Sequence, residues 1–299
     1  DVEQVRKVIT HRAWGIFPNE KYVAFTRAVV QNMFNGHSHS RVSSPLGWLE
    51  TVAKISATDI KNWHQEKYGI GNFFIVLAGA LEQSHLDLIK NMLQDIPKVI
   101  PSETSYGTIN KPLNNNFTRN ADEIGEVKEQ VEIGFLRAYS HLPITKNEVW
   151  SLLKRVMHDL LNERLRTEHA ICYNVFVTNL LDKSFSMFAV NVNTDEKHIE
   201  LVKQEFWNIL GEIRDKKHEK KFELIKKLGI DQVRSYERLS EDIIDLSLRQ
   251  VSKFNGYIIT EEEQLKEMEK VTYDSIVNLM DEIFDPEYLF TEIILPSRK

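Results

Sequence analysis

Two side chains with the capacity to bind a ligand stand seven positions apart in residues 162–177, NERLRTEHAICYNVFV. Arg166 belongs to a helix-like run rich in charge, and Tyr173 to a strand-like run of alternating apolar residues. A guanidinium held in place can bind a carbonyl or carboxylate with two donors, and a phenol can donate to a developing oxyanion. The spacing alone favours a simpler interpretation, in which Arg166 forms a surface ion pair with Glu163 or Glu168 and Tyr173 packs on a sheet.

The composition is that of a soluble globular protein, with 299 residues, of which 42% are hydrophobic and 27% charged. No run approaches the roughly 18 apolar residues of a spanning helix, and the first residues do not resemble a signal peptide, so we expect no membrane segment. The basic cluster at 216–227 has glutamates at helical spacing. It predicts a solvated helix face, and we expect no nucleic-acid partner.

The single cysteine, Cys172, excludes an intrachain disulfide and a multi-cysteine zinc cage. It is predicted to be a small buried hydrophobic residue. It fits a reducing compartment without establishing one, so the compartment is unknown. The serines at positions 38, 40, 43 and 44 form no nucleophile turn, and the chain has no Gly-rich phosphate loop. Metal binding by His37, His39, His64, His85, His141 and His158 is disfavoured, because they lack acidic partners at ligand spacing.

Hydrophobic periodicity divides the chain at residues 98–117, where prolines, a glycine and an asparagine run predict a linker. In the first domain, residues 1–97, it predicts helices at 21–34, from Ser56, and at 81–96, and a buried strand at 72–79. In the second domain, residues 118–299, it predicts a strand at 127–135, a helix at 149–161, a hairpin of strands at 172–180 and 185–193, and a helix at 199–213. Further helices are expected within 222–254 and at 271–283, and a strand at 288–295. This order indicates an α+β fold with two layers.

Two stretches resemble the pitrilysin and insulinase family of zinc metallopeptidases, which includes mitochondrial processing peptidase and its non-catalytic relatives. The first, residues 36–79, carries the family marks Gly36, His37, Arg41, Gly47, Glu50, Ile55, Thr58, Asp59, Ile60, Tyr68, Asn72, Ala78 and Gly79. The second is the phrase 165–168, LRTE, followed by Tyr173. The resemblance covers nearly the whole chain. It implies two-layer α/β sandwich domains of the LuxS/processing-peptidase type, with the first domain incomplete.

The resemblance also implies a role for Arg166 and Tyr173. In these peptidases the pair reaches across a clamshell chamber to the zinc site of the other half, binds the substrate and helps to stabilise the transition state. With this match, a substrate-binding role for Arg166 and Tyr173 becomes the favoured interpretation.

The zinc motif of the family, His-x-x-Glu-His, does not occur in this chain. The family's further glutamate ligand lies on a helix that resembles the segment with Glu3, Arg6, Val8 and Ile9, but its position falls at or near Arg12. A cation there would repel Zn²⁺. We therefore expect no metal ligand and no catalytic residue in this chain alone, and zinc on the partner half if the assembly is active.

Two functions follow as hypotheses. The chain is a non-catalytic half of a zinc metallopeptidase, whose partners are a zinc-bearing peptidase-like subunit or N-terminal half and a peptide substrate. Alternatively, it is a structural or assembly protein with a degenerate peptidase fold. The resemblance implies a further portion of the first domain before Asp1. Either this chain is a fragment that lacks that portion, or a separate chain carries it.

Overall fold

The computed structural model describes residues 1–16, 19–41, 47–100, 105–140, 146–182, 184–235, 240–253 and 256–298. Contacts divide the chain into two units, which are described separately. Unit 1 comprises Asp1–Phe17, Val42–Ser105 and Glu237–Ile258, and unit 2 comprises Pro18–Arg41, Tyr106–Tyr236 and Ile259–Lys299. The domain bounds expected from sequence stay a prediction. No described helix has the length and apolar character needed to cross a membrane.

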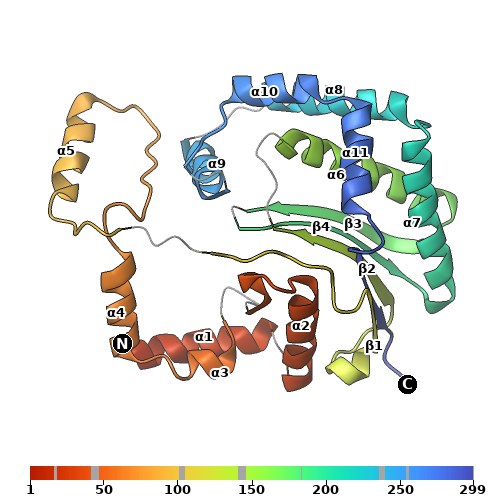
Figure 1. The fold of residues 1–299 in the computed structure, drawn as a ribbon, viewed down its shortest axis with the longest axis horizontal. Coiled ribbons are helices and arrows are strands. Elements are labelled where there is room, and N and C mark those ends of the chain that lie inside the picture. Colours follow the sequence, from red (N-terminus) through yellow and green to blue (C-terminus); the bar gives the residue numbers. More distant parts are fainter. Residues whose placement is uncertain are drawn as a thin grey trace. The chain divides into compact units, whose positions relative to one another are not determined.

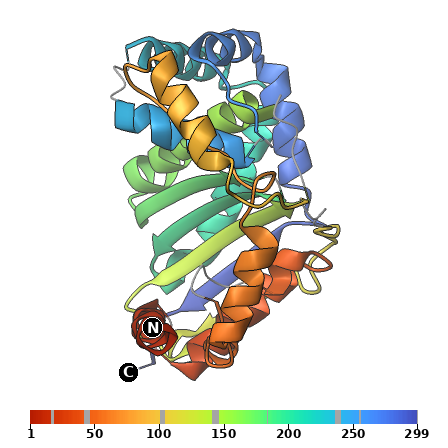
Figure 2. The same cartoon turned by 90° about the vertical axis from the view of Figure 1, so that its left-hand side faces the viewer.

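Unit 2 is built on a five-stranded mixed sheet of order β1-β5-β2-β4-β3 (Figures 1 and 2). Its strands are β1 Asn116–Asn120, β2 Val131–Tyr139, β3 Cys172–Leu181, β4 Ser186–Thr194 and β5 Phe290–Leu295. β1 runs parallel to β5, and the other neighbouring pairs are antiparallel. The predicted hairpin at 172–193 is confirmed as β3 and β4, and β3 forms an edge of the sheet. The predicted α+β fold with two layers is confirmed.

Helices cover one face of this sheet (Figure 1). They are α6 Asn147–Leu161, α7 Ile199–Arg214 and α11 Tyr273–Ile283, and beyond them α8 Glu219–Ser235 and α10 Glu261–Lys270 pack against α6. The inward residues of β2 expected from period two, Val131, Ile133 and Phe135, are at most 2% exposed. They meet the apolar stripe of α6 in one large core. The ring of Phe206 on α7 stacks on Phe135, with centroids 3.9 Å apart, and fixes this helix to the sheet.

The opposite face of the sheet packs against α2, Glu20–Met33, through two smaller apolar clusters. The segment from 106 to 115, inside the predicted linker, belongs to unit 2 and lies along the end of α2. There, Asn32 Nδ2 donates to the carbonyl of Asn114 over 2.6 Å, and the amide of Asn110 donates to the carbonyl of Asn35 over 2.9 Å. This part of the predicted linker is therefore held by hydrogen bonds to its own unit.

Unit 1 contains α1 Val2–Ile16, α3 Leu49–Val52, α4 Ala57–Lys67, α5 Gln83–Leu93 and α9 Ser240–Lys253. The helix predicted from Ser56 is confirmed as α4, because Ser56 and Asp59 form a capping box at its start. The buried strand predicted at 72–79 is wrong. This segment forms no strand, and its Phe73, Phe74 and Ile75 are 40–58% exposed. A strand needs a neighbour for its ladder hydrogen bonds, and the described part of unit 1 provides only the isolated bridge between Ile70 and Lys98.

Glu292 on β5 is a partly buried carboxylate on the α2 side of the sheet, opposite Gly134 in register. Burial raises its pKa to about 7, and the charge of Glu132 adds to the rise, while Lys128 opposes it. An acid whose folded pKa is raised does not change the free energy of unfolding below its unfolded pKa. It lowers that free energy as pH rises from about 4.5 to about 7, and the loss persists above pH 7.

We therefore expect Glu292→Gln to raise the free energy of unfolding by about 2 kcal/mol at pH 8 and to leave it unchanged at pH 4. Urea unfolding at both pH values measures this difference. The control is Glu223→Gln, which removes an exposed carboxylate of α8. An equal gain in the free energy of unfolding at pH 4 and pH 8 would show that ionisation of Glu292 is not the cause of the destabilisation.

Candidate functional site

Arg166 lies on η4, Asn162–Glu168, a π-helical segment that continues α6 without a break. π-Helical turns are rare and are frequent at functional sites. Leu165, beside Arg166, is fully buried in the core of unit 2. The segment closes with hydrogen bonds from the amide of His169 to the carbonyl of Arg164 and from the amide of Ile171 to the carbonyl of Leu165, at 3.1 and 2.9 Å. The backbone that carries Arg166 is therefore anchored on both sides.

Tyr173 is placed by an irregularity at the start of the edge strand β3. Cys172 pairs with Thr194 and Asn174 pairs with Asn193, so Tyr173 is the extra residue of a β-bulge. A bulge redirects side chains and is frequent beside active sites. Here it exposes both Tyr173 and Asn174, and Tyr173 is 56% exposed. Between η4 and this bulge, Ala170 adopts a left-handed backbone with φ 52°, a costly conformation for a residue with a Cβ.

The acidic neighbours of Arg166 are bound by other cations. Glu163 pairs with Lys221, and Glu168 pairs with Arg164 at 3.1 Å. Within the part of the chain that the structure describes, Arg166 is exposed and makes no hydrogen bond or ion pair. The ion-pair alternative predicted for Arg166 from spacing is therefore wrong, and Arg164, two residues earlier, has that role.

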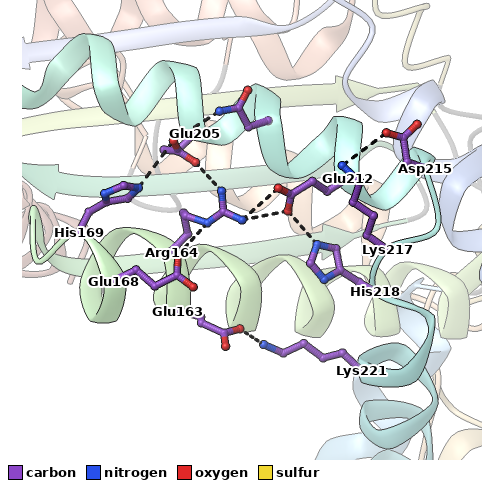
Figure 3. Close-up of polar contacts among 11 residues, drawn as sticks. Glu163, Arg164, Glu168, His169, Glu205, Glu212, Asp215, Lys217, His218 and Lys221 are labelled. Atoms are coloured by element: carbon purple, nitrogen blue, oxygen red, sulfur yellow. Dashed lines mark hydrogen bonds and ion pairs between the residues drawn. The ribbon is translucent and has the colours of Figure 1, made fainter.

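Arg164 is the centre of a polar network (Figure 3). Its Nη1 donates to Glu205 Oε2 at 2.8 Å, and its Nη2 donates to both carboxylate oxygens of Glu212 at 3.1 and 3.0 Å. With the pair to Glu168, the guanidinium contacts three carboxylates. Both Glu205 and Glu212 belong to α7, so the network joins η4 to this helix.

Two histidines flank this network in Figure 3. His218 Nε2 lies 3.0 Å from Glu212 Oε2, and His169 Nε2 lies 3.7 Å from Glu205 Oε1. Burial by itself raises the pKa of Glu212, but hydrogen bonds from His218 and Arg164 outweigh it and lower that pKa below its ordinary value. The Glu212 carboxylate is thus held in its charged form, which keeps its pair with Arg164 strong.

This network is not evident from the sequence patterns. The signal that could have found part of it is the spacing of four between Arg164 and Glu168 on one helical face. Glu205 and Glu212 are seven residues apart, which also places them on one face of α7. The contact between η4 and α7 is long-range, however, and no local pattern predicts it.

A shallow groove connects η4 to β3. Its volume is about 560 Å³, and its lining includes Arg166, Lys221 and the residues from Asn174 to Phe176. Tyr173 is not part of the lining, so the structure brings Arg166 together with the start of β3 but does not place Tyr173 in the same groove. Cys172 is buried, as predicted. Burial raises the pKa of its thiol, which the charge of Arg166 opposes.

The described residues do not fit a zinc site. Among them, no group of three or more histidine, cysteine or acidic side chains could hold a metal ion. Arg12, the position matched to the family's ligand, is exposed on α1. Both ring nitrogens of the buried His37 are used within unit 2. One lies 3.0 Å from the carbonyl of Ser184, and the other accepts from the amide of His39 over 3.1 Å.

Among the described residues, the remaining candidate histidines are not gathered at one site, while Ser38, His39 and Ser40 share the short turn η1, Ser38–Arg41. His64, His85 and His158 are exposed on three different helices, while His141, Ser43 and Ser44 lie outside the described residues. In the basic cluster at 216–227, Lys216 pairs with Asp274 at 2.6 Å, and Lys226 donates to the carbonyl of Val271 over 2.7 Å. These intramolecular bonds agree with a solvated helix face. The absence of a nucleic-acid partner stays a prediction.

Comparison with known proteins identifies the family. The sequence profile described as peptidase M16 inactive domain matches residues 54–228, more than half of the chain. The chain belongs to this family, which confirms the resemblance to the zinc metallopeptidases and assigns the chain to a non-catalytic, peptidase-like part. No curated protein sequence matches it.

Solved structures show the same fold at low sequence identity. A peptidase M16 inactive domain from Pseudomonas fluorescens is 13% identical with a TM-score of 0.79, and the match covers 100% of this chain and 71% of that one. The periplasmic protease PqqL from Escherichia coli is 16% identical with a TM-score of 0.76, covering 98% and 34%. A chain of Complex III2 from Candida albicans is 9% identical with a TM-score of 0.75, covering 98% and 71%.

Proposed function

We propose that this chain is the substrate-binding, non-catalytic half of a zinc peptidase, and that Arg166 and Tyr173 contact a peptide held at a zinc site on a partner subunit or N-terminal half. The observation that carries the proposal is the contrast between neighbouring residues. Arg164 is fully engaged inside unit 2, whereas Arg166 and Tyr173 are exposed and without polar partners among the described residues.

The local backbone supports a binding role for both side chains. Arg166 stands on an anchored π-helical turn and Tyr173 on a bulge of a hydrogen-bonded strand. Because their backbone is already ordered, binding a ligand does not require ordering of the backbone, and this part of the entropic cost is absent. A guanidinium then binds a peptide carbonyl or carboxylate through two donors, and the phenol donates to an oxygen that gains charge. Zinc, held by the partner, supplies the hydrolytic chemistry.

The test is a zinc-dependent peptide-cleavage assay with this chain alone, with a family member that carries His-x-x-Glu-His, and with both together. Cleavage is expected only in the mixture. We expect Arg166→Ala and Tyr173→Phe each to reduce its kcat/KM about a hundredfold, as the loss of a transition-state donor does. Arg234→Ala and Tyr68→Phe are matched controls, because both residues are exposed elsewhere and lie outside the groove lining.

A second candidate is an assembly role without proteolysis, favoured by the likeness to a chain of Complex III2 from Candida albicans. In that case the chain associates with its partner, and Arg166→Ala and Tyr173→Phe leave both association and any activity of the assembly unchanged. An active mixture indifferent to both substitutions would overturn the substrate-binding proposal and support this one. Cleavage by this chain alone would overturn both.

A further inference from the structure

The groove between α6, η4 and β3 has the size of a ligand site. Its volume of about 560 Å³ falls in the range typical of small-molecule and cofactor pockets. Asp159 of α6, Arg166 of η4, and Asn174 and Phe176 of β3 line it, with Lys221 of α8. Phe176 is 53% exposed, so the groove offers an apolar surface next to its charged groups.

Among the described residues, one cation and one carboxylate of the groove lining form no ion pair, Arg166 and Asp159. Lys221 is bound by Glu163, while Glu168, Glu205 and Glu212 are bound by Arg164. Within the described residues, Arg166 has no ion pair and the Asn174 side chain makes no hydrogen bond. Asp159 lies in the same lining but forms no ion pair with a described cation. A ligand group that satisfies Arg166 must therefore accept hydrogen bonds, and a carboxylate does so most strongly; the amide of Asn174 is able to donate to the same group.

We propose that this groove selects a peptide with one carboxylate next to an apolar side chain, the carboxylate binding Arg166 and the apolar group packing on Phe176. This inference rests on the proposed function and adds the substrate class to it. Asp159 limits the preference to a single carboxylate, because a second one is repelled by it. The source of the carboxylate is an acidic side chain or the C-terminus of the peptide, and the experiment separates them.

The experiment measures binding of three fluorescent ten-residue peptides to the full chain by anisotropy. The first has one glutamate between leucines and an amidated C-terminus, the second has glutamine in its place, and the third has glutamine with a free C-terminal carboxylate. We expect the first or the third to bind about tenfold more tightly than the second, the gain of one charge-assisted bond. Tighter binding of the first peptide would identify an acidic side chain as the source of the carboxylate, and tighter binding of the third would identify the C-terminus.

Variants of the groove test the assignment. Arg166→Gln is expected to abolish the tenfold preference, and Asp159→Asn to tighten binding of the carboxylate peptide about threefold. Arg166→Glu is expected to prefer a peptide with lysine in place of the glutamate. Arg234→Gln makes the same charge change outside the groove lining, and we expect it to keep the tenfold preference for the carboxylate peptide. Thermal unfolding of each variant confirms that it is folded.

The outcomes distinguish this inference from the function on which it rests. If Arg166→Gln weakens all three peptides equally, Arg166 binds the peptide backbone; the substrate-binding function then stands and the carboxylate preference is overturned. If Arg166→Gln changes no affinity, or the folded chain binds none of the peptides, both proposals are overturned.

Discussion

Replacement of Arg164 by methionine is expected to lower the free energy of unfolding of unit 2 by about 3 kcal/mol. The side chain of Glu205 is only 9% exposed, and Arg164 is the cation that lies within hydrogen-bond distance of it. Methionine keeps most of the aliphatic volume but leaves the carboxylates of Glu205 and Glu212 without this partner. A buried charge that loses its partner costs far more than the pair contributes in the intact protein.

Urea unfolding followed by circular dichroism measures this loss. The matched control is Arg214→Met on α7, whose guanidinium pairs with Asp281 where both side chains are about half exposed. The control is expected to lose less than 1 kcal/mol, because exposed ion pairs contribute little. An Arg164→Met variant that loses no more than Arg214→Met would show that the network does not stabilise η4. A larger loss for Arg164→Met would mean that the network also helps to hold the backbone of Arg166, because Arg164 and Arg166 belong to the same short segment, η4.

Phe206→Ala is expected to lower the free energy of unfolding by about 4 kcal/mol. Its ring is fully buried, lies parallel to Phe135 within 2°, and meets Phe284 edge-on with centroids 5.3 Å apart. Alanine removes these contacts and leaves a cavity between α7 and the sheet. Since α7 also carries Glu205 and Glu212, we expect faster amide hydrogen exchange in this helix and in η4.

The control for Phe206→Ala is Leu224→Ala on α8, where the side chain is 57% exposed. A change within about 0.5 kcal/mol is expected there. Phe206→Leu refills part of the cavity, so we expect it to lower the free energy of unfolding by less than half as much as Phe206→Ala does. Equal losses for Phe206→Ala and Leu224→Ala would contradict the packing of α7 on the sheet. Hydrogen exchange confined to α7 would show that η4 is positioned independently of this helix.

Local patterns were sufficient for most helices and strands of unit 2, but not for β1, η4 or α10. The apolar stripe from Val149 to Leu161 predicted α6, because residues three and four apart share a helical face. Alternation predicted β2, β3 and β4, because successive side chains of a strand point to opposite faces. β1 was not predicted, since Asn116–Asn120 is polar and exists as a strand only through its pairing with β5.

The same patterns failed where a structure depends on partners. Residues 72–79 are as apolar as a buried strand, yet the described part of unit 1 gives them no neighbouring strand. Composition predicts that a segment is able to form a strand. Hydrogen bonds to another strand decide whether it does.

The sequence by itself determined the family, the α+β order of the second unit, and the selection of Arg166 and Tyr173 as candidates, because each depends on residue types and short spacings. Only the tertiary structure decided which arginine has no ion pair among the described residues. Arg164 and Arg166 are two residues apart on one short segment, but α7, some forty residues later, places Glu205 and Glu212 beside Arg164. Arg166 is left exposed, because Glu168, Glu205 and Glu212 bind its neighbour Arg164 and Glu163 binds Lys221.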